Sequence, residues 1–284
     1  MTLPADYVTR SAKDKLELLW KEIRADPYGD ELPHRVPSGW ERRKLFSVGY
    51  NRVSFEHEGD EVPPGRRKLV HTYGTTARVT LHVDDDRGYT GLFASGASGI
   101  LRFSDASGGG ASPSMAIKFM RDGKPSVNFF ALPYRARDPA DRNPLTGVYA
   151  NASPPPQALD TKLVAWSFQR TANALGGKRL YAVYLPLHHL AQTDASGAEV
   201  ADPRVPDRLE LHGTLEAREA LIDDRDWRRS LAALPTGVRL FDLKIAESID
   251  ARAEAYGCLT LDAPFVASRY GDEQLFFQHD VGPR

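Results

Sequence analysis

Residues 68–83 read KLVHTYGTTARVTLHV. Aliphatic side chains stand among threonines in this stretch, and that composition is typical of a strand half-buried in a pleated sheet. The residues before it, from 30 to 65, are charged and interrupted by prolines. The sequence therefore predicts mostly irregular structure up to residue 65 and a sheet that begins near residue 68.

Seven similar runs follow this strand. They lie at residues 99–103, 115–120, 126–132, 179–187, 208–215, 238–246 and 257–261. Turn-forming residues such as Asp122-Gly123 separate them. The run at 208–215 alternates apolar and polar residues, as expected for a sheet with one face in water. The pattern predicts a closed antiparallel β-barrel of about eight strands with peripheral helices, in the β-rich α+β class.

Three stretches predict helices outside the barrel. Residues 12–25 place their leucines and Ile23 mostly on one face, with charged residues between them, which is the pattern of a packing helix. A second helix is expected at residues 160–175 and a short third one at 223–233. The first two are predicted to pack outside the barrel, and the third is expected to expose Asp226, Arg228 and Arg229.

The chain is expected to form a single domain over residues 1–284. The prolines at 154–156 are stiff and extended, but the strand pattern resumes beyond them, so they mark an excursion inside one domain. Within it, residues 1–60 are predicted as a helical arm and loop, and residues 61–284 as the barrel.

Composition narrows the class of protein. The 284 residues include 37 Lys and Arg against 38 Asp and Glu, a balance that argues against a nucleic-acid binder. A single cysteine, Cys258, excludes an internal disulfide and a cysteine-built zinc site. No apolar run is long enough for a membrane span, and the N-terminus does not have the pattern of a secretion signal. We expect a soluble, cytoplasmic protein, with homo-oligomerisation left open.

Generic catalytic motifs are missing from the sequence. It has no phosphate-binding loop, and Gly96-Ala97-Ser98-Gly99 does not have the spacing of a nucleophile elbow. His188 and His189 are predicted to end a strand, where adjacent side chains point to opposite faces and cannot hold one metal ion. Cys258 is expected to be a small buried hydrophobe.

A different set of residues indicates a family. His71 lies inside the first apolar strand, and about thirty residues later residues 99–106 read GILRFSDA. Residues 115–123 then read MAIKFMRDG, and residues 125–130 read PSVNFF. In this order and spacing they resemble the haem catalase superfamily, and most closely its small branch of catalase-related allene oxide synthases and their bacterial relatives. The resemblance covers about residue 65 to the C-terminus.

The resemblance implies a haem b cofactor and assigns three roles. His71 would be the distal acid–base residue, Asn128 the second distal polar group, and Arg102 a partner of a haem propionate. Heterolysis of a peroxide O–O bond on ferric iron needs a proton moved from the inner to the outer oxygen. A neutral histidine can move that proton, while an amide orients the peroxide.

Neighbouring positions refine this assignment. Ser104 is expected to hydrogen-bond to His71 and set its tautomer. Lys68 or Arg67 would serve the second propionate. Val70 beside the histidine favours catalase or peroxidase behaviour, since the coral-type allene oxide synthases have threonine there.

The sequence departs from the family at its C-terminal end. The family holds iron through a tyrosinate on an Arg-x-x-x-Tyr helix that follows the barrel, and no such helix is evident here. Tyr256 completes an Arg-x-x-x-Tyr match with Arg252, but it precedes the last strand. Tyr270 has suitable neighbours, but Val266 stands where the arginine is expected. Both tyrosines remain candidate iron ligands.

Two functions therefore remain. The first is a haem-dependent oxidoreductase or lyase acting on hydrogen peroxide or fatty-acid hydroperoxides, and the distal residues favour it. The second is a haem-free barrel that binds an apolar small molecule or lipid, or transforms it without iron. The missing ligand helix favours the second.

Overall fold

Strands make up most of the secondary structure. The computed structural model describes residues 3–33, 73–84, 87–105, 114–133, 159, 162–166, 172–173, 179–180, 187–192, 194, 196, 198–224, 226–248 and 251–277. The main sheet contains β1 (Tyr73–Val83), β2 (Ala97–Asp105), β3 (Ser114–Phe119), β4 (Val127–Pro133), β5 (Leu163–Trp166), β8 (Arg208–Gly213), β9 (Arg239–Ala246) and β10 (Glu254–Val266). Two short strands, β6 (Ala172–Asn173) and β7 (Arg179–Leu180), pair separately.

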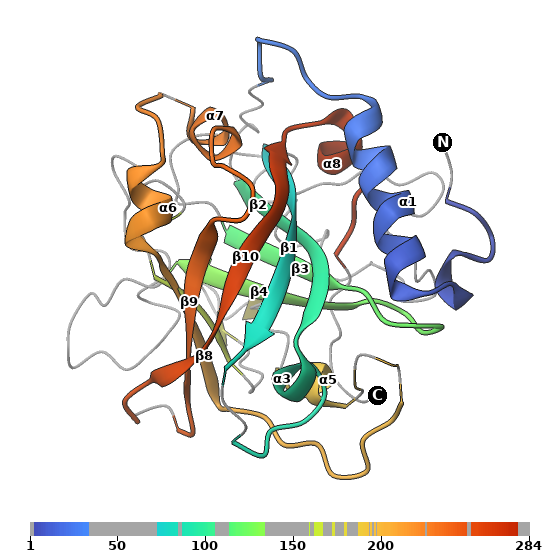
Figure 1. Ribbon diagram of the computed structural model, residues 1–284, viewed down its shortest axis with the longest axis vertical. Helices are drawn as coiled ribbons and strands as arrows, with labels where there is room; N and C mark the ends of the chain where they lie inside the picture. Colours follow the sequence, from blue (N-terminus) through green and yellow to red (C-terminus); the bar gives the residue numbers. More distant parts are fainter. Residues whose placement is uncertain are drawn as a thin grey trace.

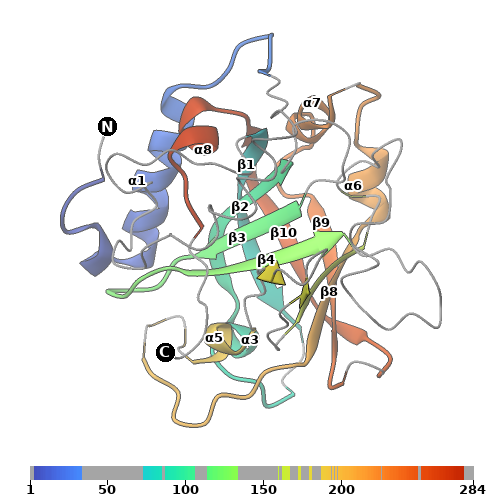
Figure 2. The same cartoon turned by 180° about the vertical axis from the view of Figure 1, so that it is seen from behind.

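The main sheet is antiparallel and strongly curled (Figures 1 and 2). Its strand order is β1-β10-β9-β8-β5-β4-β3-β2, and β2 pairs in turn with β1. The pairing is extensive from β10 through β1 to β4. It is thinnest between β4 and β5, where only Leu132 with Val164 and Pro133 with Leu163 are in register.

Alternation along the strands separates two faces. Odd-numbered residues of β1, β2 and β3 face the inside of the curl, where Val79, Leu101, Phe103 and Ile117 are buried. Side chains of β8, β9 and β10 complete this inner core. Burial of these apolar surfaces is the main favourable term that holds the sheet in its curled form.

A second apolar layer covers the outer face of β2 and β3. Helix α1 (Ala12–Ala25) begins at Ser11, whose side chain accepts a hydrogen bond from the Asp14 amide. The α1 side chains pack on Ile100, Ala116 and Met120 together with residues of the C-terminal segment. The α1 side chains in this layer are Leu16, Leu19, Trp20 and Ile23.

The C-terminal segment lies beside α1 (Figure 1). It contains helix α8 (Arg269–Glu273), which begins at Ser268. Two backbone hydrogen bonds of 3.0 Å join the segments, from the Tyr28 amide to the Ala267 carbonyl and from the Arg269 amide to the Asp26 carbonyl. The ends of the described chain therefore form one outer layer.

Short helices lie at the two ends of the curled sheet. Helices α3 (Leu92–Ser95) and α5 (His188–Ala191) lie side by side at one end, and α6 (Leu215–Glu219) and α7 (Trp227–Ala232) lie toward the other (Figures 1 and 2). A short 3₁₀ helix, Tyr7–Thr9, precedes α1. Within the described ranges, every helix is too short or too polar to traverse a lipid bilayer.

Several sequence predictions are confirmed. The chain is β-rich and antiparallel with few helices, and the helix expected at residues 12–25 is α1. The short helix expected within 223–233 is α7. The strand predicted at 179–187 is described only at β7, because residues 181–186 lie outside the described part.

Two predictions are wrong. The region 160–175 contains strands β5 and β6 where a helix was expected. Leu163 pairs with Leu211 of β8 in the sheet, and this distant partner overrides the local helical pattern. His188 and His189 begin helix α5 and do not end a strand.

We predict that α1 contributes directly to the stability of the curled sheet. Leu19 is fully buried, so Leu19→Ala should lower the free energy of unfolding by about 2–5 kcal/mol, measured by urea denaturation. The matched control is Leu215→Ala, because Leu215 is 63% exposed, and it should change stability by about 0.5 kcal/mol or less. Equal effects of the two substitutions would contradict the packing described for α1.

Candidate functional site

The sequence-predicted site is only partly described. His71, Val70, Lys68 and Arg67 lie outside the described residues, so the proposed distal histidine and its hydrogen bond to Ser104 stay predictions. Arg102 and Ser104 lie on β2, and Asn128 lies on β4.

Arg102 and Asn128 share the outer face of the sheet. The odd-numbered residues of β2 and β4 point inward, whereas Arg102 and Asn128 are even-numbered and point outward. Strand β3 lies between β2 and β4. Lys118 of β3 pairs directly with Asn128 and lies on the same face. We call Arg102, Lys118 and Asn128 the polar wall; their exposed fractions are 1%, 2% and 7%. Three polar side chains are thus buried where neighbouring positions are apolar.

Lys118 was not singled out from the sequence. Its ammonium nitrogen lies 5.6 Å from the centre of the Phe277 ring, in the range of a cation–π interaction. The sequence does indicate its position, because in a strand reading MAIKFM a lysine two residues from Ala116 and from Met120 lies on the same face as both. Nothing local to β3 indicates that the C-terminal segment covers that face.

Arg102 forms a buried ion pair with α8. Its Nη2 donates to Asp272 Oδ1 at 2.8 Å, and both side chains are almost completely enclosed. Burial lowers the pKa of the Arg102 guanidinium, and the Asp272 carboxylate opposes that shift. Gly74 makes room for the arginine, since a Cβ there would lie 2.6 Å from Nη2.

Tyr28 adds a phenol beside this pair. Burial, followed by the negative charges of Asp272 and Glu273, raises the pKa of Tyr28 to about 12. The phenol is therefore neutral at physiological pH. The anionic partner of Arg102 in the described structure is thus the Asp272 carboxylate.

The two candidate iron ligands lie in different places. Tyr270 lies on α8 and is buried in the outer layer with α1. Tyr256 lies on β10, not on a helix, and belongs to the inner core. Its hydroxyl donates to the Phe93 carbonyl, and its ring makes an edge contact with Tyr89.

The inside of the sheet holds one small apolar cavity among the described residues. Its volume is about 10 Å³, room for about one water-sized sphere. Its walls come from the strands and from α3 and α5. The lining residues are Leu81, Leu92, Phe93, Ile117, Phe119, Leu190, Leu209, Leu211, Leu243, Tyr256 and Leu259.

The described residues do not fit a haem. Arg102, which would hold a propionate, is enclosed and already paired with Asp272. Tyr270, Leu275 and Phe277 pack on the same outer face as the polar wall, so protein side chains fill this layer. The inner cavity is far below the roughly 300–1,000 Å³ of ordinary ligand pockets.

A second polar centre surrounds Glu210 on the outer face of β8. Its Oε1 accepts hydrogen bonds from Arg208 Nε at 2.9 Å and Lys162 Nζ at 3.2 Å, and its Oε2 lies 2.8 Å from His212 Nε2. Burial alone would raise the pKa of the Glu210 carboxyl. The His212 hydrogen bond and the two positive charges outweigh burial and hold the pKa below its ordinary value.

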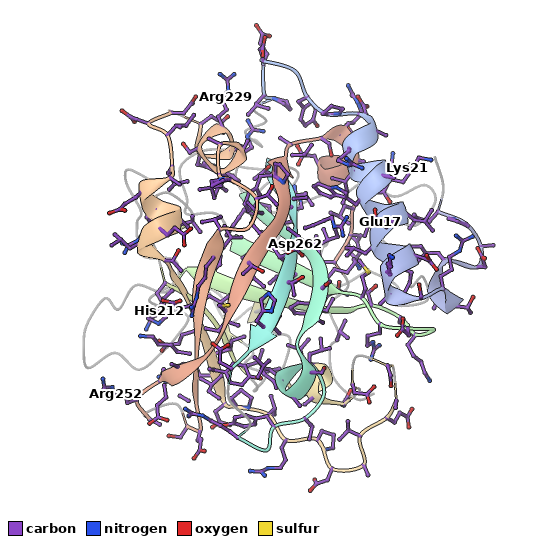
Figure 3. The ribbon with its side chains drawn as sticks, in the orientation of Figure 1. Glu17, Lys21, His212, Arg229, Arg252 and Asp262 are labelled. Carbon is purple, nitrogen blue, oxygen red and sulfur yellow. The ribbon has the colours of Figure 1, made fainter. Side chains whose placement is uncertain are left out.

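The ionised Glu210 fixes the tautomer of His212. A carboxylate can only accept, so Nε2 must carry the proton that is shared with it. The ring projects to the side of the sheet in Figure 3. The alternation of residues 208–215 already places Arg208, Glu210 and His212 on one face. Among the described residues, no three His, Cys, Asp or Glu side chains gather as a possible metal site.

Comparisons with known proteins give no match: neither a protein-family model, nor a curated protein, nor a solved structure matches this chain. The catalase resemblance therefore stays a prediction from the residues quoted for it.

We predict that the Arg102–Asp272 pair stabilises the outer layer. Asp272→Ala leaves a buried guanidinium without its counter-charge and should cost about 3–5 kcal/mol in urea denaturation. The double variant Arg102→Met/Asp272→Leu should recover most of that loss, because it removes both charges. Asp26→Ala breaks the exposed pair with Arg269 and should leave stability nearly unchanged. A double variant as unstable as Asp272→Ala would contradict this prediction.

Glu210 should make stability depend on pH in acid. Its folded-state pKa lies below the ordinary 4.5, so its contribution is present above that value and is lost as the pH falls through the folded-state pKa. Glu210→Gln should be less stable than the wild type at pH 7, and the difference should shrink below about pH 4.5. Thermal unfolding from pH 3 to pH 7 measures this. A difference that is constant across the range would exclude Glu210 as its source.

Proposed function

We propose that this chain is a closed, catalase-like β-barrel of eight strands that acts without haem and binds an apolar small molecule or lipid in its interior. The observation that carries the proposal is the pairing of Arg102 with Asp272. The side chain that would neutralise a haem propionate is neutralised by the chain's own α8.

The inner cavity supports an apolar ligand. Its lining is aliphatic and aromatic, and its one hydroxyl, that of Tyr256, is bound to the Phe93 carbonyl. Such a surface attracts hydrocarbon through the hydrophobic effect and has few groups that could hydrogen-bond to a polar ligand. A lining of this kind suits binding more than acid–base chemistry, which needs a titratable group within reach of the substrate.

A haem-dependent enzyme is the second candidate. Arg102, Ser104 and Asn128 have the same alternation and lie toward the same face of β2 and β4, which would let them act on one group. For haem b to reach them, α8 and the residues up to Phe277 would have to leave that face. Peroxide or fatty-acid hydroperoxide chemistry with His71 would then follow the resemblance.

Titration of the purified protein with hemin and with parinaric acid, a straight-chain fluorescent fatty acid, distinguishes the candidates. We expect parinaric acid to bind with one site per chain, and hemin to give no saturable one-to-one Soret change. Leu211→Phe fills the cavity and should weaken parinaric acid binding at least tenfold, whereas Leu215→Phe on the surface should not.

The opposite pattern supports the second candidate. A stoichiometric Soret band that is lost in Arg102→Met would overturn the haem-free proposal. Circular dichroism of each variant shows whether it has folded. Leu211→Ala provides a second variant, which enlarges the cavity and should strengthen binding if the fatty acid occupies it.

A further inference from the structure

Helix α3 separates the inner cavity from the end of the sheet. Its Leu92 and Phe93 line the cavity and are almost fully buried. The helix is only four residues long and lies between Gly91, with φ of 62°, and Gly96, with φ of 66°. Residues other than glycine rarely adopt such angles, so the chain has a conformationally permissive position at each end of α3.

Few polar contacts hold α3 in place. The Phe93 carbonyl accepts a hydrogen bond from the Tyr256 hydroxyl, which ties the helix to β10. Just before α3, Thr90 Oγ1 donates to the Ala191 carbonyl at 2.9 Å and accepts from the Arg204 amide at 2.9 Å. The Thr90 amide also donates to the Arg204 carbonyl at 3.1 Å. Apolar contacts include those of Phe93 with the rings of Tyr89 and Tyr256.

We propose that α3 is the gate of the cavity, and that it turns outward about Gly91 and Gly96 to admit a single unbranched hydrocarbon chain. This inference rests on the proposed binding of an apolar ligand. The closed cavity of about 10 Å³ cannot hold such a chain, so Leu92 and Phe93 must move away while the ligand enters, and the lining side chains must change rotamer to hold it once α3 has closed behind it. A slender chain requires the least further displacement of the strand residues behind them.

The hydrogen bond from Tyr256 to Phe93 acts in this proposal as a latch. It is present in the closed state with or without ligand and is broken while the gate is open. Its removal should therefore lower the barrier to association and to dissociation equally. The equilibrium affinity should stay the same, which separates a latch from an ordinary contact with the ligand.

Tyr256→Phe tests the latch in stopped-flow measurements with parinaric acid. We expect association and dissociation rates to rise together about five- to tenfold, with Kd unchanged, which corresponds to about 1–1.4 kcal/mol for one neutral hydrogen bond. The matched control is Tyr89→Phe. It removes a hydroxyl from the same aromatic cluster, leaves the bond to Phe93 intact, and should leave both rates unchanged.

Hydrogen exchange tests the gate without any ligand. The Phe93, Ala94 and Gly96 amides donate within α3 and its preceding turn. Their exchange should accelerate by a similar factor in Tyr256→Phe but not in Tyr89→Phe.

These readouts separate the two proposals. If wild-type protein does not bind parinaric acid but exchange accelerates as expected, the proposed ligand fails and the gate stands. If the fatty acid binds but neither its rates nor the exchange respond to Tyr256→Phe, the gate is wrong. A changed Kd with unchanged rates of association would make Tyr256 a ligand contact and would also overturn the latch.

Discussion

A buried arginine on a strand of the curled sheet constrains the rest of this structure. The Arg102 guanidinium is shut off from water, and an isolated charge in that position would cost several kcal/mol. Its counter-charge, Asp272, is 170 residues away in the sequence. The C-terminal segment must therefore return to β2, and α8 must present its carboxylate at the right height above the sheet.

The same constraint reaches the N-terminal helix. Once α8 is in place, Arg269 donates two hydrogen bonds to Asp26, from its amide to the backbone carbonyl and from Nε to the carboxylate. The segment around Tyr28 therefore lies along the same edge. Helix α1 then closes over Ile100 and Ala116 beside Tyr270. Both ends of the described chain thus form the outer layer together, and the Arg102–Asp272 ion pair lies within it.

Only part of the curled sheet is therefore covered by protein on both of its faces. Strands β2 and β3 lie between the inner core and the outer layer, whereas the outer face of β8, β9 and β10 carries polar groups. Asp262 lies on that polar face in Figure 3, where its carboxylate accepts a 2.6 Å hydrogen bond from Thr80.

Local patterns sufficed for part of this architecture. The helix at 12–25 and the strands around the 122–123 turn follow from side-chain periodicity and turn residues alone. The strand at Leu163–Trp166 could not be found in this way. Four residues are too few for periodicity to distinguish a strand from a helix, and pairing with β4 and β8 makes this segment a strand. The shared face of Arg102 and Asn128 follows from alternation. Asp272 as the partner of Arg102 does not, since no short-range signal links the two residues.

The Arg102–Asp272 ion pair accounts for the position of α8 better than for the stability of the folded chain. An apolar pair of similar volume could fill the same space at little or no cost, so stability alone gives no reason to keep two buried charges. An apolar contact, however, would let α8 shift along the sheet, because hydrocarbon surfaces have no preferred register. Arg102 donates to Asp272 through Nη2, and Gly74, which has no side chain, leaves the room that the guanidinium occupies. The pair therefore fixes where Asp272 of α8 lies against β2, and with it the placement of Tyr270 and Leu275 over the outer face. The chain thereby keeps its polar wall closed by a defined arrangement of its own C-terminal residues.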